Sequence, residues 1–338
     1  MSMTDFFSLE ITDNAIKIFD GEILPKEIVT KKINLLDNLP FSFFSQDTPD
    51  TSQKFAEIIK KLVSDLKIGK RKVNVIIPDV YTYSQILPMP YLNEKELISA
   101  IKYQADQFIP LPIDEVNIDL EILYKNEKAK NLLVMVVAAP KKLATKIEEL
   151  INLSGLIPNV LENQLSSFGR FLTKFSSFLT QKFSQKIVFI NLDHNSTSLY
   201  FFDPNISLIS KVHTFNLGYS LFLKELQINT SFDNKKINEL LSSFDPKSKN
   251  PVDVETIITP VTKQFVFEIK KIISPDMIFF LIGEVFRFPA LPTIFSKNIN
   301  STSFSIFDPY PLFKPDPQVD HYKNFLSFFV TTFGGQIE

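Results

Sequence analysis

The same opening pattern occurs twice along this chain, once near its start and once past its middle. The first copy predicts three strands and then a helix, at 6–11, 15–19, 26–33 and 52–66. The second copy predicts three strands, at 187–192, 196–202 and 206–215, and a helix after Gly218. Two halves that open alike are typical of a duplicated α/β domain.

A different, alternating pattern lies between the two copies. It predicts a strand, a helix, two strands and a second helix, at 82–87, 93–108, 118–124, 132–139 and 141–153. Asn93 and Glu96 form a capping-box pattern at the start of the first helix, and Pro110 and Pro112 prevent that helix from continuing. We therefore expect a separate small subdomain over 83–160.

Composition excludes several kinds of site. The 338 residues carry a net charge of −2 and no run of four basic residues, which argues against a nucleic-acid partner. With no cysteine there is no disulfide, thiolate metal site or cysteine nucleophile. His194, His213 and His321 lack metal-ligand spacing, and no Walker, HExxH or GxSxG motif occurs.

Targeting signals are also missing. No segment reaches the roughly 20 apolar residues of a membrane span. The first residues lack the basic and apolar regions of a signal peptide. We expect the protein to stay in the cytoplasm, with no membrane span of its own.

The two predicted hairpin tips are the candidate nucleotide site. Duplicated domains of this kind hold ATP between such tips, where glycines let backbone N–H groups approach phosphate. This chain has only 8 glycines, and its tips read Glu10-Ile11-Thr12-Asp13-Asn14 and Asn191-Leu192-Asp193-His194-Asn195. Plain β-turns at both tips are the alternative, because Asp and Asn favour turns.

A long motif lies in the alternating segment, from Lys95 to Asp119. It contains Lys95-Glu96-Leu97, Ala100-Ile101, Tyr103, Ala105-Asp106 and the run Ile109-Pro110-Leu111-Pro112-Ile113-Asp114-Glu115-Val116. This stretch resembles the PilM family of type IV pilus assembly proteins, whose pattern is K-E-L-x-x-A-I-x-Y-x-A-E-x-x-I-P-F-P-I-D-E-V-x-x-D. Weaker similarity extends to LEITDNAIKIF, INLDHNSTSLYFF and FLIGEVFRFPALPTIF.

The resemblance implies an α/β, two-lobed actin-like ATPase fold with a small inserted α+β subdomain, as in the division protein FtsA. The expected first lobe is 1–82 with 161–186 and 313–338, the insertion is 83–160, and the second lobe is 187–312. ATP and Mg²⁺ would bind between the lobes. The residues implied for that site are Glu10, Lys17, Asn191, Ser196, Thr197, Gly218, Glu268 and Gly283.

The nucleotide motifs depart from the family pattern where glycine or aspartate is expected. The departures are Thr12, Asn191, Asp193, Glu284 and Val285. Carboxylates in a phosphate loop repel phosphate. We therefore expect weak binding of ATP and Mg²⁺, weak or absent hydrolysis, and no catalytic residue.

The resemblance also implies a partner, the short cytoplasmic tail of the membrane protein PilN, bound near the insertion. We expect Phe108, Ile109, Pro110, Leu111 and Pro112 to form an apolar ridge for it, because two prolines stiffen this chain segment. The alternative is that the ridge only pins the insertion to the first lobe.

The expected role is a scaffold on the inner face of the cytoplasmic membrane that links this tail to the pilus assembly ATPase complex. Other functions of the same superfold stay open. One is an active ATPase or small-molecule kinase, which intact phosphate loops would favour. Another is the cytoplasmic domain of a type II secretion platform protein, which would continue into a membrane helix. FtsA itself would end in an amphipathic membrane-binding helix, and we expect none at 331–338.

Overall fold

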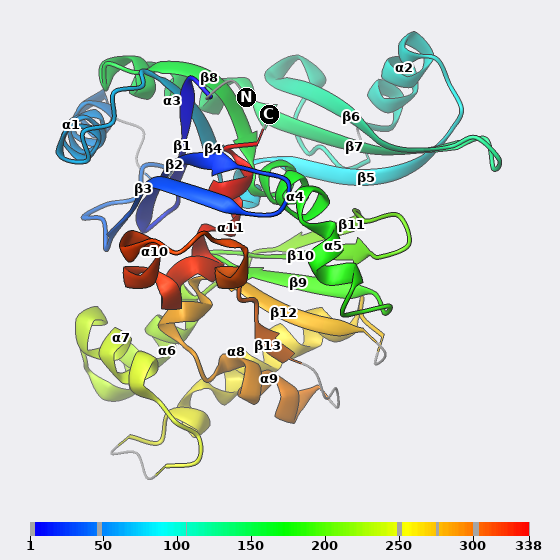
Figure 1. The fold of residues 1–338 in the computed structure, drawn as a ribbon. Helices are drawn as coiled ribbons and strands as arrows, with labels where there is room; N and C mark the ends of the chain where they lie inside the picture. The colour runs from blue at the N-terminus through cyan, green and yellow to red at the C-terminus, as the bar shows by residue number, and fades with distance from the viewer. Residues whose placement is uncertain are drawn as a thin grey trace.

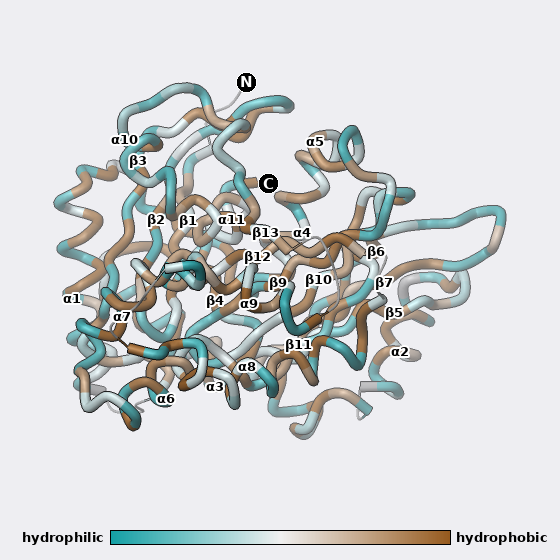
Figure 2. Tube along the Cα trace, turned by 90° about the horizontal axis from the view of Figure 1, so that it is seen from below, coloured by the Kyte–Doolittle hydropathy of each residue, from teal (hydrophilic) through white to brown (hydrophobic). Residues whose placement is uncertain are grey.

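Three β-sheets organise the computed structural model, which describes residues 4–45, 49–105, 107–248, 252–274, 277–299 and 304–337. Two five-stranded sheets form two lobes stacked on one another, and a three-stranded sheet projects from the side of the first lobe (Figure 1). Apolar residues are concentrated along the central strands and the helices between them, while the hairpin of the small sheet is largely hydrophilic (Figure 2).

The first sheet has the strand order β3-β2-β1-β4-β8. Its strands are β1 (Phe6–Ile11), β2 (Ala15–Ile23), β3 (Ile28–Asp37), β4 (Lys72–Ile77) and β8 (Ile157–Asn163). The first three form an antiparallel meander, and β4 and β8 continue the sheet in parallel with β1. Helices α1 (Pro49–Asp65) and α3 (Lys141–Leu153) pack together and bury their apolar sides against this sheet.

The second sheet repeats this topology in the order β11-β10-β9-β12-β13. Its strands are β9 (Ile187–Leu192), β10 (Thr197–Asp203), β11 (Leu208–Phe215), β12 (Ile278–Gly283) and β13 (Phe304–Ile306). Its core is shared with helices α6 (Ser220–Thr230), α7 (Asn234–Ser243), α8 (Val254–Lys270) and α9 (Leu291–Asn298). The predicted duplicated α/β architecture is confirmed.

Two helices run between the sheets, α4 (Gln164–Lys174) and α11 (Leu326–Gly334) (Figure 1). They cross closely: the Ser167 hydroxyl donates to the Thr331 carbonyl, and a Cβ at Gly334 would clash with the Ser167 backbone. Phenylalanines fill the space around the crossing, including Phe168, Phe171, Phe189, Phe329 and Phe333. The short helices α5 (Ser176–Thr180) and α10 (Pro317–His321) flank this layer.

The small sheet has the order β5-β7-β6, with β5 (Tyr83–Pro90), β6 (Val116–Asn126) and β7 (Asn131–Pro140). Helix α2 (Glu94–Ala105) covers one face. The predicted capping box is confirmed, since the Glu96 N–H donates to Asn93 Oδ1 at 3.1 Å and the Asn93 N–H donates to Glu96 Oε2 at 3.0 Å.

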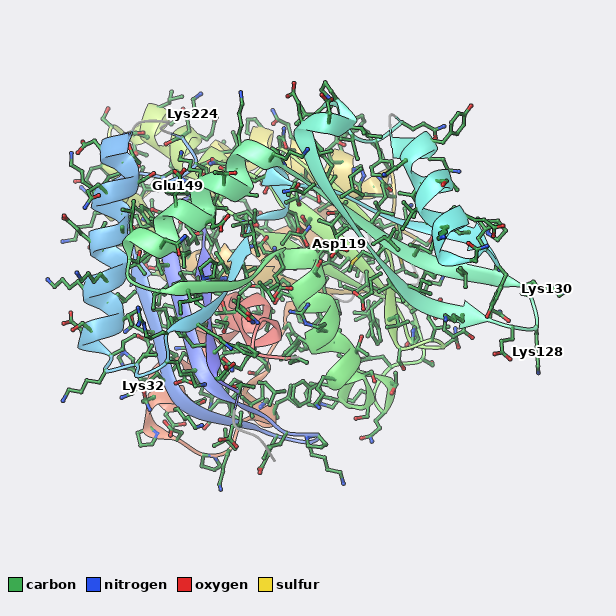
Figure 3. All side chains as sticks on the ribbon, turned by 90° about the horizontal axis from the view of Figure 1, so that it is seen from above. Lys32, Asp119, Lys128, Lys130, Glu149 and Lys224 are labelled. Carbon is green, nitrogen blue, oxygen red and sulfur yellow. The ribbon has the colours of Figure 1, made fainter. Side chains whose placement is uncertain are left out.

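Helix α3 and strand β8 do not belong to this small sheet. Ile147, Leu150 and Ile151 pack into the core of the first lobe, and β8 pairs with β4. In Figure 3, Glu149 on α3 lies over the first sheet, whereas Lys128 and Lys130 project from the far tip of the β6–β7 hairpin. We therefore propose that the insertion is 83–140, because the segment up to 160 has already returned to the first lobe.

Several elements differ from their predicted extents. Helix α8 ends at Lys270, and the helical region near the C-terminus is divided into α10, a 3-10 turn and α11. The sequence did not predict strand β8, because its exposed and buried residues do not alternate. The helix expected from Asn93 ends at Ala105; Asp106 lies outside the described residues.

Candidate functional site

The two hairpin tips occupy equivalent places at the ends of their sheets. The Thr12 N–H donates to the Ala15 carbonyl at 2.9 Å, and the Asp193 N–H donates to the Ser196 carbonyl at the same distance. Thr12 and Asp193 therefore start the same tight turn in the two lobes. Glu10 and Asn191, two residues earlier, are both buried.

Glu10 is a buried carboxylate with a full set of donors. The Lys17 ammonium lies 2.8 Å from Glu10 Oε1, and Gln164 Nε2 donates to the same oxygen at 2.9 Å. Thr331 and Thr332 of α11 donate their hydroxyls to Oε2 at 2.6 and 2.7 Å. Since both carboxylate oxygens are already paired, Glu10 has little capacity left for a further ligand.

The hydrogen-bonding capacity of Lys17, like that of Glu10, is fully used within the protein. Its ammonium donates to the Phe328 carbonyl at 2.6 Å and to the Thr331 hydroxyl at 3.3 Å, and it lies 4.0 Å from the centre of the Phe328 ring. With the Glu10 contact, these partners use all three ammonium hydrogens. Lys17 therefore joins the first hairpin to α11 instead of facing an open cleft.

Gln164 connects the two tips. Its Nε2 donates to Glu10 in the first lobe and to Asp193 Oδ1 in the second lobe, the latter at 3.1 Å. Its Oε1 accepts from Asn191 Nδ2 at 2.9 Å. The side chain is held there because Gln164 is the first residue of α4, whose N-terminus is capped by Asn163.

A second buried link joins Asp79, just after β4, to the second lobe. The Tyr200 hydroxyl of β10 donates to Asp79 Oδ2 at 2.5 Å, and the Leu165 N–H donates to Asp79 Oδ1 at 2.9 Å. Burial raises the pKa of Asp79, against the hydrogen bond from Tyr200. Burial likewise raises the pKa of Asp193 well above its usual range, against the attraction of Lys17.

Gly218 and Gly283, the two glycines implied for the nucleotide site, pack against the protein's own backbone. A Cβ at Gly218 would clash with the His194 carbonyl, and the N–H groups of Tyr219 and Ser220 donate to the carbonyls of Asp193 and His194 at 2.9 and 2.8 Å. Gly283 has φ 81°, and a Cβ there would clash with the Leu192 carbonyl. Both glycines thus shape the second hairpin tip.

A salt-bridge cluster closes the far side of the cleft. Arg287 Nε donates to Glu284 Oε2 at 2.9 Å, and its terminal nitrogens form two hydrogen bonds with Asp37 of the first lobe. His194 Nδ1 lies 3.6 Å from Glu284, beyond hydrogen-bonding distance. Burial would lower the pKa of His194, but the Glu284 carboxylate raises it above its usual value.

Beside this cluster lies a cavity of about 1140 Å³, bordered by both lobes. Asn14, Asp37, Asn238, Phe286, Arg287 and Phe325 are among its lining residues. Asn14 of the first hairpin tip lines it, but none of the eight residues that the resemblance implies for the nucleotide site does. The cavity therefore lies beside the hairpin tips, whose own side chains fill the space between them.

Comparison with known proteins decides the family. The model of the type IV pilus assembly protein PilM family matches residues 9–208. The chain belongs to the PilM family. A solved structure described as a PilM–PilN type IV pilus biogenesis complex is 18% identical, with a TM-score of 0.82 over 99% of this chain and 98% of that chain.

A more distant likeness is to the ethanolamine utilization protein EutJ from Carboxydothermus hydrogenoformans. It is 9% identical, with a TM-score of 0.57 over 98% of this chain and 88% of that one. Together these structures confirm the predicted two-lobed actin-like ATPase fold. No curated protein matches the sequence at a significant level.

The residues predicted for the nucleotide site of this PilM-family chain meet only in part. Glu10, Lys17 and Asn191 share one hydrogen-bonded network, and Ser196 and Thr197 are buried at the second tip. Glu268 is instead on α8, where it pairs with Lys271 at 2.8 Å. Gln164, Asp79, Tyr200 and Thr331–Thr332 were not predicted, because they come from four distant segments that no motif connects.

The predicted partner ridge is partly core. Ile109 is only 4% exposed and packs on Val116 and Ala138, whereas Pro110 and Pro112 are exposed and Leu111 is half-buried. A groove of about 400 Å³ lies on the opposite face of the small sheet. Its lining residues include Ile86, Met135, Leu165, Gly169, Arg170 and Ile209. The insertion thus offers two surfaces to a partner.

No helix within the described ranges has both the length and the apolar character needed to cross a bilayer.

Proposed function

We propose that this PilM-family chain is a non-catalytic scaffold of type IV pilus assembly. It binds the cytoplasmic tail of a PilN-like membrane protein at the inner face of the membrane and links that protein to the assembly ATPase complex. The nucleotide site of the fold is degenerate. The observation that carries this proposal is the buried Glu10–Gln164–Asp193 network between the hairpin tips.

The donors and acceptors between the tips do not fit a Mg-nucleotide. Glu10 and Lys17 are satisfied by each other and by α11, and the first N–H groups of α6 are bonded to the second tip. The N–H and the carboxyl group of Asp193 at the second tip are already bonded to Ser196 and Gln164. Triphosphate binding would have to break these contacts and expel the Gln164 side chain.

Isothermal titration with Mg-ATP tests this part of the proposal. We expect affinity weaker than micromolar, and no phosphate release above that of a chain-free control. Binding tighter than micromolar, or turnover abolished by Lys17→Ala in a folded variant, would show that the site retains its activity.

The groove is the surface that fits a peptide tail best. Its lining is largely apolar and includes Arg170; within the part of the chain that the structure describes, the buried atoms Arg170 Nε and Glu162 Oε2 have no hydrogen-bond partner. Arg170 and Glu162 pair through their other atoms at 2.6 Å. An extended peptide has alternating apolar side chains for such a groove and backbone groups for unpaired polar atoms. The PilM–PilN description of the similar structure supports a tail of this kind.

The ridge is the other candidate surface. Along β7, Val134, Val136 and Ala138 face α2 and the ridge, whereas Met135 faces the groove. Because the two surfaces lie on opposite faces of one sheet, a substitution on one leaves the other in place. We propose that the groove is the main binding site for the tail. Pro110, Leu111 and Pro112, on the opposite face of the small sheet, stabilise the shape of the insertion.

Gly169 gives a direct test, because a Cβ there would make only an ordinary 3.8 Å contact with Ile209. Gly169→Leu fills the groove from α4, and Gly169→Ala is its matched control; both are better helix formers than glycine. A peptide copying the tail of the PilN-like protein of the same organism should bind wild type and Gly169→Ala but not Gly169→Leu.

The same titration with Leu111→Asp, and with Leu111→Ala as its control, tests whether the tail binds to the ridge. If Leu111→Asp loses the peptide while its circular dichroism stays native, and Gly169→Leu binds normally, the tail lies on the ridge. If wild type binds no tail peptide at all, the proposed function is wrong.

A further inference from the structure

We propose that the Gln164 side chain, with the Asp79–Tyr200 pair, locks the two lobes closed without nucleotide, and that this closure builds the tail-binding groove. The second half of this inference rests on the proposed function. The first half concerns only the relation between the lobes and can be measured without a partner.

The groove straddles the boundary between the lobes. Leu208 and Ile209 of β11 belong to the second lobe, whereas Ile86 and Met135 come from the small sheet attached to the first. Helix α4 supplies a further wall, with Leu165 and Gly169. A rotation of the second lobe away from the first would therefore separate the groove's walls, since no single lobe contains them all.

The N-terminus of α4 belongs to both the lock and the groove. Gln164 is bonded between the hairpin tips, and the Leu165 N–H is bonded to Asp79. The Leu165 side chain lines the groove. The first turn of α4 thus connects the lock directly to the groove. A contiguous set of contacts of this kind can carry coupling between two sites.

Both Nε2 hydrogens and the Oε1 atom of the Gln164 carboxamide form hydrogen bonds in this lock. Its two Nε2 hydrogens go to Glu10 and Asp193, one in each lobe, and its Oε1 accepts from Asn191. Tyr200 adds a second crossing through its 2.5 Å bond to Asp79. All these side chains are buried, so opening the lobes removes their partners together.

The carboxyl groups around residue 164 favour a glutamine there over a glutamate. Glu10 and Asp193 lie on either side of the carboxamide, and Lys17 is the cation beside them. Asp79 accepts a hydrogen bond from the N–H of Leu165, one residue further along α4. Replacing the donating Nε2 by a carboxylate oxygen would set acceptor against acceptor at Glu10, remove the donor to Asp193 and favour separation of the lobes.

The experiment compares Gln164→Glu with Gln181→Glu, the same chemical change at an exposed residue after α5. Small-angle scattering measures the radius of gyration, and hydrogen exchange measures protection of the Leu165 amide. We expect Gln164→Glu to enlarge the radius, to lose that protection and to weaken tail binding about tenfold. Gln181→Glu should match wild type, and Mg-ATP should leave the wild-type affinity for the tail unchanged.

Three results would overturn the inference: a Gln164→Glu protein with the wild-type radius and protection, opened lobes with unchanged tail affinity, or tail binding that requires Mg-ATP. If Gln164→Glu does not fold, Tyr200→Phe replaces it, because that variant removes only the hydroxyl that donates to Asp79 and accepts from Asn191 Nδ2. If wild type binds no tail while Gln164→Glu still opens the lobes, the proposed function fails and the lock remains.

Discussion

Single buried carboxyl groups set the chemistry of the cleft. Glu10 pairs with Lys17 at 2.8 Å, whereas burial favours the protonated form of Asp193. The two residues are bridged by one carboxamide, so a small chemical change at either alters the balance of donors and acceptors. The protonation of Asp193 therefore contributes to the stability of the closed protein.

Asp193→Asn tests this at the residue scale. The pKa of Asp193 is raised in the folded state, so between its unfolded value, about 4, and its folded value the folded protein holds the extra proton. Wild-type stability must then fall as pH rises through that window, by up to about 1.4 kcal/mol per pH unit. Asparagine does not ionise, so the variant should gain stability relative to wild type as pH increases.

Urea unfolding from pH 4 upward measures this difference. Carboxyl groups that do not interact with Asp193 are common to both proteins and cancel in the comparison, whereas Glu10 and Asp79 are part of the same network. Parallel stability profiles for the two proteins would contradict the burial argument for Asp193.

Among the elements, α2 depends most on its own sequence. It is a short helix on a three-stranded sheet, and its small core contains Leu97 and Ile101. The capping box at its start was predicted from two residues and is present in the structure. Local hydrogen bonds of this kind stabilise an element whose tertiary contacts are few.

Asn93→Ala should therefore destabilise α2. We expect a loss of about 1 kcal/mol, because the first helical N–H groups lose their acceptor. Hydrogen exchange at the first turn of α2 and urea unfolding measure the effect. Ser99→Ala is the control, since this exposed hydroxyl bonds only to the Lys95 carbonyl within the helix. Equal protection in the two variants would mean that the cap contributes nothing.

At the scale of the whole molecule, the two lobes are held together by contacts on both sides of the central helices. Gln164 and Tyr200 cross on one side, and Asp37 of β3 meets Arg287 of the second lobe on the other. Arg287 is buried and Asp37 is about a quarter exposed. Such a forked pair has more geometric specificity than a single surface contact.

A double-mutant cycle of Asp37→Asn and Arg287→Gln measures this contact. We expect a coupling energy of about 1–2 kcal/mol from urea unfolding, reduced from a fully buried pair by the exposure of Asp37. The exposed Lys54–Asp50 pair of α1 is the control, with an expected coupling of about 0.3–0.5 kcal/mol. Equal coupling in the two pairs would show that the interlobe contact adds no more stability than an exposed ion pair.

The sequence by itself determined the duplicated architecture and the family. Apolar periodicity predicted both meanders and the helices α1 and α3, because burial on one face imposes its period on the chain. The Lys95–Asp119 motif predicted the family that the comparison then showed. The absence of glycine at Thr12 and Asp193 was also visible, and it motivated the proposal of a degenerate nucleotide site.

Only the tertiary structure decided what fills the space between the hairpin tips and where the groove lies. Gln164, Asp79, Tyr200 and Thr331 meet because the folded chain brings four segments to one point, and local sequence carries no signal of such distant hydrogen bonds. The burial of Ile109 and the position of the groove are likewise products of sheet packing. Periodicity fixes which face of an element is apolar, whereas the neighbour that covers that face is chosen by the packing of the whole molecule.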